Sequence, residues 1–107
     1  MKLIIAIINN DDANIVNSNL SKNGFFVTKI ASTGGFLMNG NSTFLIGVQN
    51  EEVDTCIEII GKYSKKRVQQ APVSMSYTGQ PYASFPAEVV VGGATIFVID
   101  VENFQRV

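Results

Sequence analysis

The strongest constraint on the fold is an N-terminal segment that is apolar at nearly every position. Residues 2–9 contain an unbroken run of Leu, Ile, Ile, Ala, Ile and Ile. Successive side chains of a strand point to opposite faces of its sheet, so a strand of this composition is buried on both faces. Residues 43–49 repeat the pattern, with Phe44, Leu45 and Ile46 in succession. The chain therefore needs cover for two faces of one sheet.

The order of the predicted elements indicates an α+β fold of the ferredoxin-like βαββαβ type. Helices are expected from Asn10 or Asp11 to Asn23-Gly24, and from Asn50 to the lysines at 62–66. Two helices can cover only one face of such a sheet, so we expect the other face to be buried against further copies of the chain. The expected strands are 2–9, 25–31, 43–49 and 86–99, the last split at Gly92-Gly93, with a weaker strand at 67–71 and a helical turn within 101–107.

Composition limits the classes of partner. The chain has 107 residues, which is enough for one domain over 1–107 and too few for two cores. Its 8 basic and 9 acidic residues give a net charge of −1, which argues against a general nucleic-acid or membrane-surface binder. The N-terminal apolar run is too short for a transmembrane helix and lacks a signal-peptide pattern, so a cytoplasmic protein is expected. A hydrophobic fraction of 46% is high for a small monomer and again favours self-association.

Few side chains are suited to catalysis or metal binding. The chain has no histidine, which excludes triads of the Ser-His-Asp kind and histidine-based zinc sites. Its one cysteine, Cys56, is expected to be a small core residue on a helix. The acidic pairs at 11–12 and 51–52 begin helices, where negative charge complements the helix dipole, and Lys65-Lys66-Arg67 is expected to be a solvated face at a helix end. Neither catalysis nor a metal site is predicted.

Residues 32–43 form the most distinctive stretch outside the apolar runs. The segment carries three glycines, two asparagines and several hydroxyls. Such a backbone can turn sharply, adopt positive φ and offer N–H groups to a ligand. Taken alone, Gly34-Gly35 is better explained by a hairpin turn than by a ligand loop. We expect flexible loops near 33–42 and 72–86, the second because that stretch has no clear hydrophobic period.

Several motifs together resemble the PII-like cyclic-di-AMP receptor family (PstA/DarA). They are Thr33-Gly34-Gly35-Phe36-Leu37, Gly40-Asn41-Ser42-Thr43-Phe44 and Val91-Gly92-Gly93-Ala94-Thr95, with Met-Lys-Leu-Ile-Ile-Ala at the N-terminus. The resemblance covers the whole chain. It implies a homotrimer of ferredoxin-like subunits without catalytic activity or cofactor. It also implies one cyclic-di-AMP in each cleft between subunits, and loops that respond to the ligand to regulate an unknown protein partner.

The resemblance also implies a set of ligand-binding residues. Phe36 and Leu37 would offer apolar surface to adenine, although they could instead fill a subunit interface. Taken alone, Phe97 is better explained as a core residue, and Gly92-Gly93 is as well explained by a kink in the sheet. Gly47, within a strand, indicates a bulge or a close backbone approach. The full set is Thr28, Gly35, Phe36, Leu37, Asn41, Gly47, Gly92, Gly93 and Phe97.

Three departures from the family pattern leave a second function open. Relatives usually carry an arginine where this chain has Phe26, and a guanidinium is a natural partner for phosphate. Relatives also tend to have a longer, glycine-rich segment where this chain has residues 74–82, and an aromatic C-terminal residue where this chain has Val107. The alternative is a trimeric PII-like interaction protein that has lost or changed its nucleotide ligand. An enzyme acting on a nucleotide is a third possibility, for which no catalytic group is evident.

Overall fold

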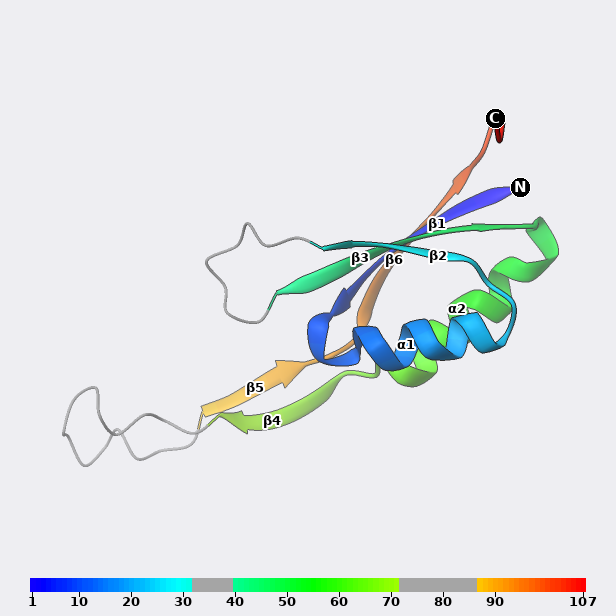
Figure 1. The fold of residues 1–107 in the computed structure, drawn as a ribbon. Coiled ribbons are helices and arrows are strands. Elements are labelled where there is room, and N and C mark those ends of the chain that lie inside the picture. Colours follow the sequence, from blue (N-terminus) through cyan, green and yellow to red (C-terminus); the bar gives the residue numbers. More distant parts are fainter. Residues whose placement is uncertain (32–39, 72–86) are drawn as a thin grey trace, which may run out of the picture.

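The fold is built on a four-stranded antiparallel sheet with two helices on one face. The computed structural model describes residues 1–31, 40–71 and 87–107. The strand order is β2-β3-β1-β6, which confirms the predicted ferredoxin-like arrangement (Figure 1). The elements are β1 (Lys2–Asn9), α1 (Asn10–Lys22), β2 (Val27–Ala31), β3 (Asn41–Val48), the 3₁₀ turn η1 (Asn50–Glu52), α2 (Val53–Tyr63), β4 (Arg67–Ala71), β5 (Ala87–Val91) and β6 (Ala94–Asp100).

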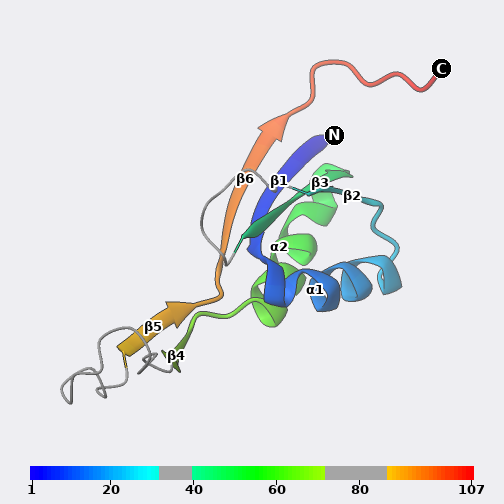
Figure 2. The same cartoon turned by 60° about the vertical axis from the view of Figure 1, so that its left-hand side comes forward.

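The expectation of one split final strand was wrong. β5 does not continue β6 within the main sheet but pairs with β4, from Arg67 opposite Val91 to Ala71 opposite Ala87. Figures 1 and 2 show this two-stranded sheet projecting away from the helices and the main sheet. The C-terminal segment 101–107 forms no helical turn. It begins with a hydrogen bond from the Val101 N–H to the Met1 carbonyl oxygen.

Local chemistry sets the limits of α1. The Asn9 side chain caps the helix by accepting a hydrogen bond from the Asp11 N–H at 2.8 Å, so the cap lies one residue earlier than expected. Acidic residues occupy the first turn and Lys22 the last, in accordance with the helix dipole. The chain leaves the helix through Gly24, at a φ of +85°, where an L side chain would be strained. Among the described residues, no helix is both long and apolar enough to cross a bilayer.

The hydrophobic core lies between the helices and one face of the sheet. Figure 2 shows α1 and α2 on the same side of the strands. In β1 burial alternates, with Ile4, Ala6 and Ile8 fully buried and the intervening residues half-buried. The buried apolar residues form one cluster: Ile4, Ala6, Ile8, Ala13, Val16, Leu20, Phe25, Phe44, Ile46, Val48, Cys56 and Ile60.

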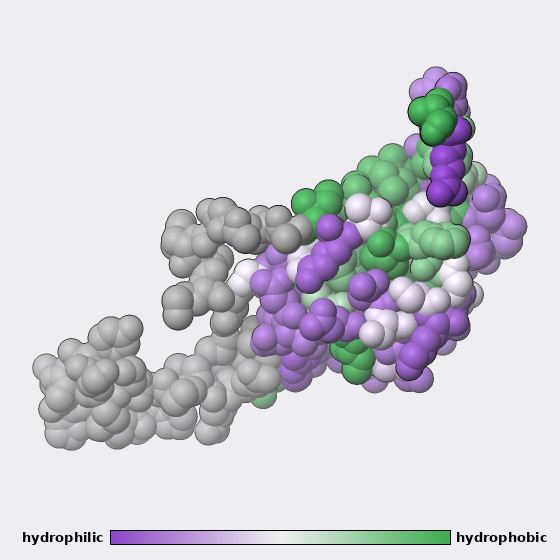
Figure 3. Space-filling view, viewed as in Figure 1, coloured by the Kyte–Doolittle hydropathy of each residue, from purple (hydrophilic) through white to green (hydrophobic). Residues whose placement is uncertain are grey.

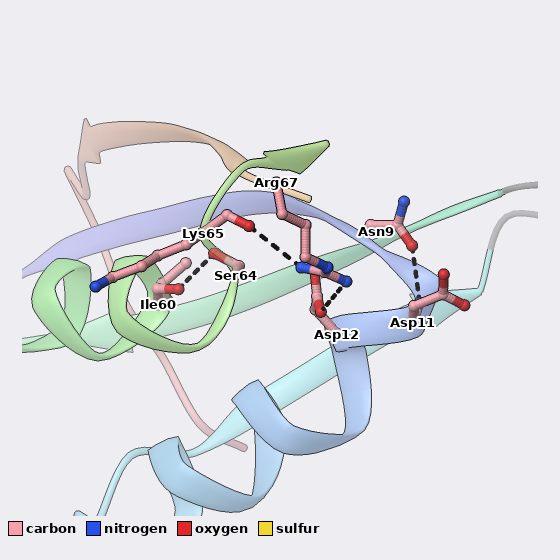
Figure 4. A network of polar contacts seen from close by, with 7 residues as sticks. All are labelled: Asn9, Asp11, Asp12, Ile60, Ser64, Lys65 and Arg67. Atoms are coloured by element: carbon pink, nitrogen blue, oxygen red, sulfur yellow. Dashed lines mark hydrogen bonds and ion pairs between the residues drawn. The ribbon is translucent and has the colours of Figure 1, made fainter. Parts of the chain in front are cut away.

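An ion pair joins the first turn of α1 to the start of β4 (Figure 4). The Arg67 guanidinium donates to both carboxylate oxygens of Asp12, at 2.9 and 3.2 Å, and also to the Lys65 carbonyl oxygen. The hydrogen bond to Asp12 raises the pKa of Arg67 above its ordinary value, which keeps the guanidinium charged. Asp12 is buried, and the side chain of Arg67 is 38% exposed. Arg67 therefore has a structural role, contrary to the expectation of a wholly solvated basic cluster.

The Gly92-Gly93 pair is required by a close backbone approach. Both residues have positive φ, of +84° and +80°. A Cβ on Gly92 would collide with the Lys65 carbonyl oxygen and lie 2.7 Å from Nη1 of Arg67. The Gly93 N–H donates to the Ser64 carbonyl oxygen. The pair thus lets the chain pass from β5 into β6 directly against the end of α2.

This contact predicts different costs for two glycine substitutions. Gly24 and Gly92 have nearly the same φ, but a Cβ on Gly24 would meet nothing within 4 Å. We expect Gly24→Ala to lower the free energy of unfolding by about 1–2 kcal/mol, the cost of the left-handed conformation alone. Gly92→Ala should cost at least about 1 kcal/mol more, because overpacking adds to that strain. Urea denaturation of both variants measures the difference, and equal costs would contradict the close approach.

A second prediction concerns Cys56, which is fully buried on α2. Burial, together with the charge of Glu52, raises the pKa of its thiol from 9.0 to about 11. Roughly one thiol in ten thousand is then ionised at pH 7, so the native protein should not react with a disulfide reagent at pH 8 until guanidinium unfolds it. A raised pKa favours the neutral thiol in the folded state. The stability from this group is therefore complete below pH 9 and declines as pH approaches 11, which denaturation at several pH values can follow.

Candidate functional site

The face of the main sheet opposite the helices is apolar. Residues paired across antiparallel strands share a face, so Leu3 lies beside Ile99, and Ile5 lies between Leu45 and Phe97. The large apolar side chains Ile30, Phe97 and Ile99 are about half exposed, at 46%, 50% and 47%. Figure 3 shows hydrophobic residues gathered over the strands, above a largely hydrophilic helix layer. We call this surface the open face.

A groove of about 840 Å³ lies at one end of the open face. Its floor comes from the middle strands of the sheet and its outer wall from the C-terminal segment. The lining residues are Met1, Leu3, Gly24, Phe25, Phe26, Thr28, Leu45, Gly47, Val48, Gln49, Glu52, Val101, Phe104, Gln105 and Arg106.

Gly47 leaves the floor of this groove open. It pairs in regular register with Leu3, and a Cβ built on it would meet no atom within 4 Å. The expected bulge or close backbone approach at Gly47 is therefore absent. Thr28 lies on the neighbouring strand β2, opposite Leu45 of β3, so its side chain is on the same face as this gap. The missing side chain provides space in front of the sheet that another molecule can occupy.

The remaining sequence-predicted site residues lie elsewhere. Asn41 is exposed at the start of β3, paired with Asn9, and does not line the groove. Phe97 is half exposed on the open face, so the expectation of a core residue was wrong, and Phe97 does not line the groove. Gly92 and Gly93 are at the junction of β5 and β6 and lie outside the groove. Three further predicted residues lie outside the described part of the chain: Gly35, Phe36 and Leu37.

Sequence reasoning missed several residues that line the groove. Leu3 and Leu45 could have been found from strand alternation, because they share a face with Gly47 and Thr28 in the sheet register. No periodic signal marks the contributions of Phe104, Gln105 and Arg106, which come from an irregular segment. Phe26 was noted only as a departure from the family pattern, yet it lines the groove and is 89% exposed.

Two side chains of opposite charge line the groove. Arg106 contributes a guanidinium from the C-terminal segment, and Glu52 contributes a carboxylate from η1. The Glu52 carboxylate accepts a hydrogen bond from the Gln49 N–H at 3.0 Å, as part of a capping box. Most of the other lining side chains are apolar or aromatic. A largely apolar groove with a few polar groups is typical of small-molecule sites.

Two comparisons with known proteins match all or nearly all of the chain. The family model described as cyclic-di-AMP receptor matches residues 1–107. Among solved structures, the chain is similar to the crystal structure of a functionally unknown protein from Pediococcus pentosaceus ATCC 25745. The two sequences are 40% identical, the TM-score is 0.75, and the match covers 99% of this chain and 96% of that chain.

Proposed function

Since the chain belongs to the cyclic-di-AMP receptor family, we propose that it binds cyclic-di-AMP in the groove beside Gly47 and acts as a non-catalytic signalling receptor. The observation that carries the assignment is the gap at Gly47, next to Thr28, in a groove of about 840 Å³. That volume is within the range of small-molecule pockets, about 300–1,000 Å³. Its apolar floor suits the flat face of adenine, and the hydroxyl of Thr28 can donate to or accept from a base or phosphate.

We further propose that the open face is buried in a homotrimer, with one ligand in each cleft between subunits. Support comes from the half-exposed Ile30, Phe97 and Ile99 on a face that no helix of the described chain covers. Contiguous apolar surface of this kind marks association sites in soluble proteins. The groove opens along the same face, so a neighbouring subunit would complete it.

Signalling would follow if the bound ligand switches the conformation of the loops near 33–42 and 72–86 and so changes the surface offered to a protein partner. These segments, and the contacts of Gly35, Phe36, Leu37 and Asn41 with the ligand, remain predictions from the family resemblance. The aromatic residue Phe26 favours one alternative function. A protein with an aromatic residue at this position could retain the trimer while binding another ligand or none.

Filling the gap at Gly47 tests the binding site directly. We expect the wild-type protein to bind cyclic-di-AMP in calorimetric titration, in preference to cyclic-di-GMP and ATP. Gly47→Val should abolish binding because its side chain occupies the groove. The variant should fold normally, since a Cβ at Gly47 meets no atom within 4 Å and valine is favoured in strands. Gly47→Ala should have a smaller effect of the same sign.

Thr43→Val is the matched control for this experiment. Thr43 is on the same strand and face, outside the groove, and the substitution adds apolar character at nearly constant volume. Its affinity should equal that of the wild type. Absence of heat from the wild-type protein with tens of micromolar cyclic-di-AMP would contradict the receptor function and favour the alternative function.

The assembly is tested by the mass of the particle in solution. Light scattering should give three times the 11.6 kDa of one chain. Phe97→Asp should yield smaller particles, because burying an unpaired carboxylate between subunits is costly. Ile15→Asp is the control: Ile15 is comparably exposed, at 48%, but lies on α1 on the other side of the sheet. The proposed interface would be disproved if the wild-type protein is a monomer, or if Phe97→Asp leaves the mass of the trimer unchanged.

A further inference from the structure

An exposed aromatic ring lines the groove without filling it. Phe26 is 89% exposed although it stands between the buried Phe25 and the start of β2. A phenylalanine that had replaced a ligand by plugging the groove would be packed against the floor and largely buried. Its ring is instead available to another flat group. Phe104, 64% exposed, lines the same groove from the C-terminal segment.

A cationic side chain reaches the groove from the C-terminal segment and not from the segment that carries Phe26. Among the described lining residues, Arg106 has the only cationic side chain. The one carboxylate of that set, Glu52, is held by the Gln49 N–H and so is engaged in the cap of η1. An anionic ligand would therefore be oriented with its phosphates toward Arg106. Its bases would then lie along the apolar and aromatic part of the groove.

We propose that Phe26 stacks on a base of the bound dinucleotide and that Arg106 supplies the charge-assisted hydrogen bonds to its phosphate. This inference rests on the proposed function, and it assigns recognition to two residues of this chain that the carried-over site set does not contain. Stacking of a base on an aromatic side chain is tolerant of base identity. A guanidinium can bind two phosphate oxygens at once. The groove can thus bind a nucleotide although the described strand residues that line it have no cationic side chain.

The role of Phe26 is tested by varying its ring at constant apolar bulk. Cyclic-di-AMP is titrated into wild-type protein and into Phe26→Tyr and Phe26→Leu variants. The tyrosine variant should bind within about threefold of wild type, and the leucine variant should bind about 5- to 150-fold more weakly, the range found for loss of one stacked base. Equal affinities of the leucine and tyrosine variants would overturn the stacking role. Light scattering and thermal melts show whether the leucine variant keeps the assembly and the fold.

Two substitutions of Arg106 test its positive charge and its two-pronged contact separately. Arg106→Gln should weaken binding about tenfold or more, and Arg106→Lys should be intermediate, because an ammonium keeps the charge but loses the two-pronged contact. Raising the salt concentration should weaken binding by the wild type more than by the glutamine variant, since salt screens an exposed charge pair. Lys29→Gln is the matched control: it removes one exposed cation from β2, outside the groove, and should bind like wild type.

The outcomes separate this inference from the function on which it rests. If the wild-type protein does not bind cyclic-di-AMP, both fail. If it binds, and Gly47→Val abolishes binding while Arg106→Gln behaves like Lys29→Gln, the receptor function stands and the role of Arg106 is overturned. The assignment of Arg106 is supported if affinity falls from wild type through Arg106→Lys to Arg106→Gln. The assignment of Phe26 is supported if Phe26→Leu weakens binding and Phe26→Tyr does not.

Discussion

The architecture depends on a mismatch between the apolar surface of the main sheet and the cover available within one chain. β1 is apolar on both faces, with Ile4, Ala6 and Ile8 buried toward the helices and Leu3, Ile5 and Ile7 half-buried on the other side. Both helices pack on the same face, and the two-stranded sheet projects away from the open face instead of covering it. The hydrophobic effect scales with apolar area, so burying the half-exposed Ile30, Phe97 and Ile99 in the proposed trimer would be favourable.

The sequence predicted those parts of the fold that follow from local periodicity. Alternation in β1, the cap and dipole signals of α1, and the buried positions of the helices are set by neighbouring residues, and the ferredoxin-like order follows from them. The partner of β5 was predicted wrongly, because Val89-Val90-Val91 has the same pattern whether it continues β6 or pairs with β4. The choice depends on contacts distant in sequence. Arg67 pairs with Asp12, and Gly92 approaches Lys65 so closely that no side chain fits.

The candidate site was predictable to a lesser degree. Thr28 and Gly47 were candidates by resemblance. The structure gives a physical reason for glycine at position 47: the absent side chain leaves room in the groove, and no neighbouring backbone approaches it closely. Leu3 and Leu45 follow once the register is known. Phe104 and Arg106 could not be predicted, because an irregular segment has no period from which to infer what it faces.

The first turn of α1 contacts the starts of β3 and β4, the strands that adjoin the two segments expected to respond to a ligand. The Asn10 N–H donates to the Gly40 carbonyl oxygen at 3.1 Å, and the Ser42 hydroxyl donates to the Asn10 side chain at 2.6 Å, which fixes the chain where it enters β3. Two residues further along the same turn, Asp12 holds Arg67 at the start of β4. The starts of both strands are thus bound to one helical turn, which is capped by Asn9 and packed on the core through Ala13. Residues 9–13 therefore help to fix the starts of both strands, in addition to the pairing of β3 with β1 in the sheet.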